Sequence, residues 1–399
     1  MSNDSYTEVT SQSWFGRIGN AFKGIVVGLI LVAVAFFLLF WNEGRAVKRY
    51  KTLKEGGGAV ISVTADQVDP GNQGKLVHLT GRADTDETLT DQVFGVSSKA
   101  IKLKRIAEMY QWREESKSEE KKKLGGGTET TTTYSYSKVW SKDLINSSGF
   151  KIPEGHQNPG RMPYPSQEQV AGGVTVGAFT ISGSLISRMQ GYTPLSLGPD
   201  YTLPPSMVME GTVSGNTIYL GGDPDAPRIG TTRVSFQEVK PMDISLVARQ
   251  VNSTFEPYQT KAGGTIELLE TGTHSAEAMF QQAQKSNTIL TWALRVGGLF
   301  LMFLGLQMIL GPLSVLADVV PLFGSIVGAG TGLIAGLVAA VLSFCTIAVA
   351  WIVYRPIIGI SLLVIAGAAA FLLITRMRKA PKVIPAAAAP PPPPPQSAT

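Results

Sequence analysis

Uncharged runs of apolar residues stand near both ends of this 399-residue chain, with a more polar region between them. Near the N-terminus, 19 residues without charge separate Lys23 from Glu43. Because a helix rises 1.5 Å per residue, roughly 20 apolar residues cross the hydrocarbon core of a bilayer. The run therefore predicts a first transmembrane helix over 24–42. Its end at Phe40 and Trp41 lacks the small residues of a signal-peptide cleavage site, which indicates a permanent anchor.

Just before this run, four apolar side chains fall on one helical face, at Trp14, Phe15, Ile18 and Phe22. This spacing predicts a short helix in the membrane interface, with a frayed tail as the alternative.

Three further uncharged runs follow in the C-terminal third, over 296–317, 319–354 and 356–375. The first and last each fit one span. The middle run would reach roughly 54 Å as a helix, which is too long for one crossing. Pro321 and the glycines that follow it favour an irregular or re-entrant segment over 318–333 and then a span. We therefore expect four spans, with five as the alternative.

The sidedness of the polar region follows from the number of spans and from charge. The tail carries a basic cluster at Arg376, Arg378, Lys379 and Lys382, which predicts a cytoplasmic C-terminus. Four spans then put the N-terminus inside and 43–290 outside. The Lys and Arg residues directly after the first span oppose this orientation.

The polar region is rich in short, often alternating segments bounded by Gly, Pro, Asn or Asp, which predicts strands. One hairpin is specific, because Tyr110 and Trp112 share a parity, as do Tyr136 and Trp140. The Lys-, Glu- and Thr-rich stretch between them, Arg113–Thr133, is expected to be a mobile loop. After the last strand, Ser275 is expected to cap a helix that continues into the second span.

The predicted fold is an α+β integral membrane protein with four transmembrane helices, one N-terminal and three C-terminal, and a large β-rich domain between the first and second. The predicted parts are a tail (1–23), a first span (24–42), a β-rich extracytoplasmic domain (43–274), a leading helix (275–295), a second span (296–317), a Gly-rich connection (318–333), a third span (334–354), a fourth span (356–375) and a basic, Pro-rich tail (376–399).

Composition agrees with a membrane location. Only 16% of the residues are charged, against about a quarter in soluble domains. The net charge of +5 comes from basic clusters beside apolar segments, which favour anionic lipids over nucleic acid. The candidate lipid contacts are Lys48, Arg49, Lys51, Arg376, Arg378 and Lys379.

Motifs for catalysis or metal binding are absent from the sequence. It has no G-x-S-x-G, H-E-x-x-H or phosphate-loop pattern. The single Cys345 and three dispersed histidines suggest no metal site, and no cofactor is expected. We interpret His78 and His156 as structural. The sequence predicts a non-enzyme, with two alternatives: an envelope hydrolase with a dispersed active site, and a transporter or channel component.

Small residues recur every fourth position at Gly324, Gly328, Gly332 and Gly336. Such a ridge lets another helix approach closely, either in the same chain or in a second copy. Asp318, which follows the second span directly, is interpreted as a loop residue.

The chain resembles the transmembrane protein 43 (LUMA) family over nearly its whole length. The resemblance rests on short stretches in a shared order: Asn42-Glu43-Gly44-Arg45-Ala46, Leu76-Val77-His78, Glu108-Met109-Tyr110-Gln111-Trp112, His156-Gln157-Asn158-Pro159, Arg233-Val234-Ser235-Phe236, Val247-Ala248-Arg249-Gln250, Thr260-Lys261, Ser275-Ala276-Glu277, Lys285-Ser286-Asn287 and Tyr354-Arg355-Pro356. It implies four spans, a large domain on one side of the membrane and self-association. It transfers no catalytic residue.

The first of these stretches is a candidate membrane-exit motif formed by Asn42, Glu43, Gly44 and Arg45. Gly44 is expected to permit a turn into the soluble domain, with an ordinary interfacial flank as the alternative. The simple basic tail suggests a bacterial member in the inner membrane, with the large domain periplasmic or extracellular. The expected role is a scaffold or organiser of membrane protein complexes. Its expected partners are membrane lipids, other membrane or envelope proteins and further copies of itself.

Overall fold

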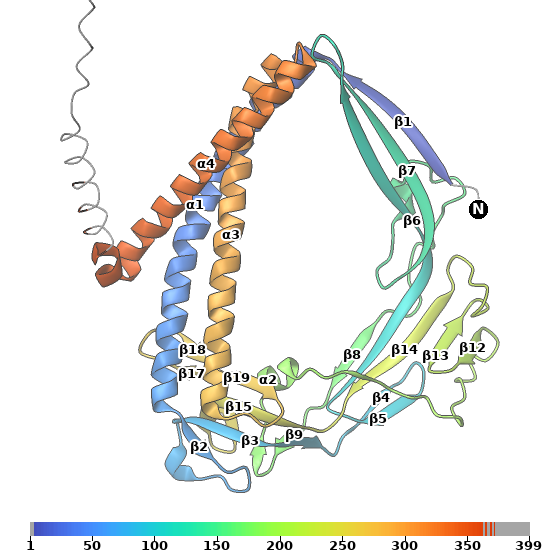
Figure 1. The fold of residues 1–399 in the computed structure, drawn as a ribbon. Coiled ribbons are helices and arrows are strands. Elements are labelled where there is room, and N and C mark those ends of the chain that lie inside the picture. Colours follow the sequence, from blue (N-terminus) through green and yellow to red (C-terminus); the bar gives the residue numbers. More distant parts are fainter. Residues whose placement is uncertain (1–3, 362–363, 365–367, 369–370, 372–399) are drawn as a thin grey trace, which may run out of the picture.

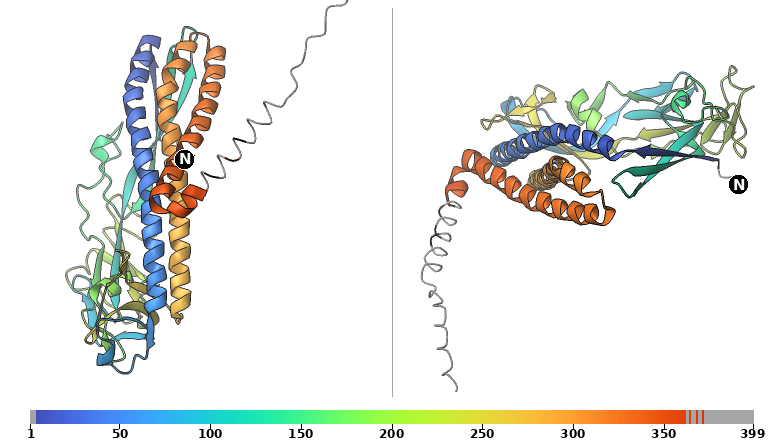
Figure 2. Two further views of the ribbon diagram at one scale, coloured as in Figure 1. Left: turned by 90° about the vertical axis from the view of Figure 1, so that its left-hand side faces the viewer. Right: turned by 90° about the horizontal axis from the view of Figure 1, so that it is seen from above.

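The computed structural model describes residues 4–361 and, beyond these, residues 364, 368 and 371. Three long helices dominate it: α1 (Trp14–Ala59), α3 (Ala276–Ala317) and α4 (Pro321–Tyr354). They pack side by side, with α4 inclined to the other two, and the β-rich part meets them at both ends (Figures 1 and 2). Each is long and apolar enough to cross a membrane, whereas α2 (Gly183–Arg188) is not.

Two sheets form most of the β-rich part. The 8-stranded sheet has the order β1 (Ser5–Gln12), β7 (Thr128–Ser141), β6 (Lys102–Lys122), β14 (Thr232–Val239), β13 (Thr217–Leu220) and β12 (Gly211–Ser214), with β11 (Thr193–Pro194) on β14 and β8 (Gln167–Val170) on β6. The 7-stranded sheet has the order β10 (Phe179–Thr180), β9 (Val174–Val176), β3 (Leu76–Thr85), β15 (Met242–Val251) and β16 (Thr254–Glu256), with β19 (Leu268–Thr271) on β15 and β2 (Ile61–Val63) on β3.

Two short ribbons complete the β-rich part, one from β4 (Thr88–Asp91) and β5 (Val96–Lys99) and one from β17 (Tyr258–Gln259) and β18 (Thr265–Ile266). The main core lies where the two sheets meet and includes Leu79, Phe94, Phe236 and Leu246, all fully or almost fully buried.

A second apolar cluster fixes the ends of α1 and α3 to the 7-stranded sheet. Leu53 of α1 and Phe280 of α3 pack with Leu76, Val247 and Ile266 of the strands. Both helices run without a break from this cluster into their apolar segments. Ser275 caps α3 by accepting a hydrogen bond from the Ala278 N–H at 3.2 Å, as predicted.

The predicted hairpin is confirmed, and Tyr110 lies opposite Trp140 with ring centroids 5.1 Å apart. The prediction of a mobile loop over Arg113–Thr133 is wrong. Strands β6 and β7 continue to Lys122 and from Thr128, so only a short turn joins them. The β-branched threonines of β7 fit extended backbone, and β7 gains a second partner because β1 pairs along it from Ser5 to Gln12.

The tip of this hairpin reaches the far end of the helices. The hairpin bows away from α1 and α3 and meets them again where α3 ends (Figure 1). There Arg17 donates to the Gly126 carbonyl, Trp14 Nε1 donates to the Val315 carbonyl at 2.9 Å, and the Gly125 N–H donates to Val319. Residues 14–22, which we expected as a separate interfacial helix, are the first turns of α1.

The irregular segment predicted over 318–333 is also absent. Instead, α4 is continuous from Pro321 to Tyr354. Proline is well tolerated at the first helical position, because the N–H that it lacks has no partner there anyway. The described residues thus contain three candidate spans. The fourth span predicted over 356–375 lies mostly outside the described residues, as does the whole tail over 376–399.

Candidate functional site

Glu43 lies at the centre of a polar junction between the three long helices. Its side chain is fully buried, and Arg295 of α3 donates to it twice, at 2.7 and 3.0 Å. Trp351 Nε1 of α4 donates to the same carboxylate at 2.8 Å. One residue of α1 therefore holds α3 and α4 through charge-assisted hydrogen bonds, which are stronger than neutral ones.

Arg45, one half-turn along α1, extends the junction toward the β-rich part. Its guanidinium donates to Asn287 Oδ1 at 3.1 Å, to Asn42 Oδ1 at 3.2 Å and to Thr291 Oγ1 at 3.0 Å. Asn42 and Asn287 also bond backbone carbonyls of the opposite helix, Thr291 and Ala46 respectively. This network joins α1 to α3, and within the part of the chain that the structure describes Arg45 forms no ion pair.

Gly44 does not turn the chain, so that prediction is wrong. It lies inside α1, which continues to Ala59 because the polar sequence after Glu43 is rich in helix-forming Lys and Arg. The lack of a side chain at Gly44 allows α4 to approach α1 closely, since a Cβ at this position would lie 2.7 Å from Cζ of Tyr354. The missing side chain lets the tyrosine at the end of α4 rest on α1.

The junction joins residues that are distant in the sequence. The Asn42–Arg45 stretch meets Asn287 and Tyr354, which belong to two further stretches that carry the family resemblance. Sequence reasoning identified the first stretch but not its partners. Arg295 was the available signal, because an isolated charge at the start of an apolar run needs a counter-ion nearby.

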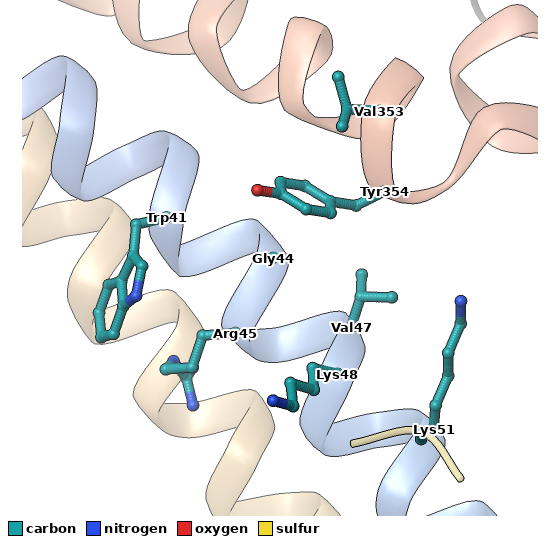
Figure 3. Close-up of a pocket in the computed structure, with 9 residues that line it drawn as sticks. Trp41, Gly44, Arg45, Val47, Lys48, Lys51, Val353 and Tyr354 are labelled. Carbon is teal, nitrogen blue, oxygen red and sulfur yellow. The ribbon is translucent and has the colours of Figure 1, made fainter. Parts of the chain in front are cut away.

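A groove opens beside the junction between α1 and the end of α4 (Figure 3). Its lining includes two of the predicted lipid contacts, Lys48 and Lys51. Arg49, the third, lies outside this groove and donates to the Thr265 carbonyl at 3.0 Å. The remaining predicted contacts, Arg376, Arg378 and Lys379, fall outside the described residues.

A second ionic cluster lies at the opposite end of the helices, around Asp318. This carboxylate is fully buried and accepts from Arg17 at 2.5 Å and from Lys122 at 2.7 Å. Burial alone would raise the pKa of Asp318, but the hydrogen bonds from Lys122 and Arg17 lower it below the ordinary aspartate value. Asp318 thus connects α1, the hairpin tip and the end of α3, a role that the loop interpretation missed.

The predicted glycine ridge faces α3 of the same chain. A Cβ on Gly324 would overlap Asp318, and those on Gly328 and Gly336 would approach Ser314 and Phe303 at 3.1 and 3.9 Å. Gly332 lies opposite Gln307. The ridge therefore serves packing within the chain, which was one of the two alternatives.

A tighter glycine contact, between α1 and α3, was not predicted. A Cβ on Gly28 would lie 2.5 Å from the Gly305 carbonyl oxygen, and one on Gly305 would lie 2.7 Å from that of Gly28. The two helices touch backbone to backbone here, as small residues permit in membranes.

Both predicted structural histidines have close polar partners. His78 lies within hydrogen-bonding distance of Ser62 and the His274 carbonyl. His156 contacts Asp4 at 2.7 Å and stacks on Tyr136 at 3.8 Å between ring centroids. Burial and a hydrogen bond donated to Glu114 raise the pKa of Tyr136 to about 12. Within the described residues, no three His, Cys, Asp or Glu side chains gather as metal ligands would.

Comparison with known proteins places these features in context. A family model described as Transmembrane protein 43 matches residues 109–356. Transmembrane protein 43 of Homo sapiens is 34% identical over 376 residues, which cover 92% of this chain and 92% of the relative. The Rattus norvegicus protein is 34% identical over 370 residues, covering 89% and 91%. The Drosophila melanogaster homolog is 30% identical over 363 residues, covering 88% and 93%. No solved structure matches this chain.

Proposed function

Because this chain belongs to the transmembrane protein 43 family, we propose that it is a non-enzymatic membrane scaffold that holds its β-rich part in a fixed position on apolar helices. The observation that carries the proposal is the polar junction at Glu43. A buried acid shared by Arg295 and Trp351 restricts how three helices can move against each other. The scaffold would present the β-rich surface to other membrane or envelope proteins.

The two continuous helices support this role. Since α1 and α3 both reach the apolar cluster around Leu53 and Phe280, no flexible linker separates the sheets from the apolar segments. A flexible linker would let the β-rich part move independently of the membrane segments, whereas two continuous helices packed against its strands do not. Scaffolds depend on such fixed geometry to bind several partners at once.

We further propose that the protein resides in a bacterial inner membrane with the core of the β-rich part extracytoplasmic, and that it self-associates. The basic tail over 376–382 supports a cytoplasmic C-terminus by the positive-inside rule. The glycine ridge of α4 is occupied by α3, so self-association would use another surface.

In this orientation β1, which precedes α1, lies on one side of the bilayer, and β7, which follows α1, lies on the other. In the structure, however, the two strands are paired over eight residues. Exposed polar strands cannot lie against hydrocarbon, because their backbone groups would lose their hydrogen-bonding partners. We propose that the paired arrangement, including the contact at Asp318, belongs to the chain outside a bilayer, and that insertion separates β1 from β7.

A disulfide test addresses this orientation. Glu8 lies directly opposite Thr132, at a separation that suits a disulfide. In a Cys345→Ser background, Glu8→Cys with Thr132→Cys should crosslink in detergent solution but not in intact membranes. The control pair, Ser118→Cys with Thr132→Cys, lies within one hairpin and should crosslink in both. Crosslinking of the first pair in intact membranes would contradict the proposed orientation.

The scaffold role is tested by crosslinking the full chain in intact membranes with a lysine-reactive reagent. The expected result is a homo-oligomer together with co-purifying membrane proteins, both reduced by Glu43→Gln. A strictly monomeric chain without co-purifying proteins would refute the proposal.

A further inference from the structure

The groove beside the polar junction, between α1 and the end of α4, is lined by both aromatic and basic side chains. Trp41 and Tyr354 border it, and Arg45, Lys48 and Lys51 of α1 line it (Figure 3). Its volume is about 550 Å³, within the range of small-molecule sites. Ala262, in the turn between β17 and β18, also lines the groove.

Among the described residues, no acidic side chain forms an ion pair within 4 Å with the positive side chains that line this groove. Arg45 uses only the neutral partners Asn42, Asn287 and Thr291. Within the described part of the chain, Lys48 and Lys51 form no ion pair within 4 Å. An anion that enters the groove would therefore meet three positively charged side chains, those of Arg45, Lys48 and Lys51.

The two neighbouring acids are already engaged elsewhere. Glu43 accepts from Arg295 and Trp351. Glu55, one turn beyond Lys51, accepts from the backbone N–H groups of Lys261 and Ala262 at 2.9 and 3.1 Å. The groove thus keeps an excess of positive charge that suits an anionic ligand.

The position of the groove indicates which anion fits. It lies where the uncharged run of α1 ends, and its border residues Trp41 and Tyr354 are of the type found at membrane interfaces. At this level a bilayer presents the phosphate groups of its lipids.

A second groove provides an independent observation. It lies between α1 and α4, further into their apolar segments, and it is lined by Phe36, Phe37, Phe40, Cys345, Thr346 and Val349. The Phe40 ring packs against Tyr354, with centroids 5.3 Å apart, so one aromatic pair separates the apolar groove from the basic one. A ligand with a charged head and an apolar chain would match both.

We propose that the basic groove binds the phosphate-bearing headgroup of an anionic phospholipid, with an acyl chain of the same lipid in the apolar groove. In this arrangement Lys48 and Lys51 contact the phosphate, and Arg45 adds to the local positive potential. Trp41 and Tyr354 pack against the glycerol part of the lipid. Inorganic phosphate shares only the first of these contacts and would bind weakly.

The proposal is tested on the full chain in nanodiscs of neutral lipid that contain a small fraction of anionic diacyl lipid. Native mass spectrometry measures the lipid retained by the wild type and by Lys48→Gln with Lys51→Gln. Because each basic residue near an anionic surface contributes a factor of roughly five, the double variant should retain the anionic lipid about 25-fold less tightly.

The matched control is Lys75→Gln with Lys142→Gln, which removes the same charge from exposed positions in the β-rich part and should leave retention unchanged. A separate arm adds inorganic phosphate at matched ionic strength and should not displace the lipid. Equal losses in both double variants, no loss in either, or displacement by phosphate would each overturn the proposal. Thermal unfolding of each variant establishes that the comparison is made on folded protein.

Discussion

Glu43 of α1 and Arg295 of α3 form a buried, doubly hydrogen-bonded ion pair, although 252 residues separate them in the sequence. The pair lies where the uncharged run of α1 ends and that of α3 begins. Since Trp351 donates to the same carboxylate, the pair fixes α4 as well. Burying a charge in this way costs free energy unless its partners are held in place. The ion pair is therefore stable only in this arrangement of the helices, and it opposes any change in that arrangement.

Replacing Glu43 tests the strength of this pair. Glu43→Gln leaves Arg295 charged and largely buried without its counter-ion, which typically costs about 3–5 kcal/mol. Thermal unfolding in detergent should therefore occur at a clearly lower temperature. The combined variant Glu43→Leu with Arg295→Met, which removes both charges, should recover much of the loss. An unchanged melting temperature for Glu43→Gln would contradict the role of the ion pair.

The contact between α1 and α3 predicts different outcomes at two glycines of the same helix. Gly28→Ala places a methyl group against the Gly305 backbone and should destabilise the protein by about 1–3 kcal/mol. Gly19 has open space around it, so Gly19→Ala should be neutral or stabilising by up to about 1 kcal/mol. Chemical denaturation of both variants measures the difference, and equal effects would refute the close approach.

Gly44 is predicted to be sensitive because of Tyr354. Gly44→Ala should displace the tyrosine ring and lower the melting temperature, even though alanine favours helix formation. Adding Tyr354→Leu, which removes the ring that the methyl group meets, should restore part of the lost stability. If the second substitution fails to compensate, then Gly44 has a role other than spacing.

Docking of the hairpin tip should depend on the ionisation of Asp318 in detergent solution. Because the pKa of Asp318 is lowered in the docked state, its contribution is complete above the ordinary aspartate value of about 3.9. The contribution disappears as the pH falls through the lower docked value. Docking should therefore persist at neutral pH and weaken only in strongly acidic solution.

Asp318→Asn should imitate this loss at neutral pH. Loss of the charged acceptor should speed hydrogen exchange at the Gly125 N–H about tenfold, since a hydrogen bond to a charged group contributes at least about 1.5 kcal/mol. Lys122→Gln should have a smaller effect in the same direction. Lys121→Gln, which alters a neighbour that does not contact Asp318, should have none. Equal exchange in Asp318→Asn and the wild type would rule out the ionic contact.

The elements that could be predicted are those with a strong local signal. The uncharged runs identify α1, α3 and α4, and the Ser275 cap marks the start of α3. The outer half of the hairpin has no such signal, because Thr, Lys and Glu alternate there without an apolar face. Its strands form because β1 supplies a partner that local composition cannot reveal. Similarly, Pro321 looks like a helix breaker, although it begins α4.

The site could be predicted only in part, for a related reason. The stretch from Asn42 to Arg45 stands out in the sequence, but its function as a junction depends on Asn287, Arg295 and Trp351, which belong to other helices. Which helix faces cover each other is decided by tertiary packing. The spacing of residues along one helix does not contain that information.

The central claim is that the Glu43 junction holds the β-rich part rigidly on the helices. The most direct measurement is the distance distribution between spin labels at Phe37→Cys in α1 and Ser253→Cys in the β15–β16 turn, in a Cys345→Ser background and in nanodiscs. We predict a single narrow distribution that broadens on Glu43→Gln. A broad distribution with Glu43 intact would contradict the claim.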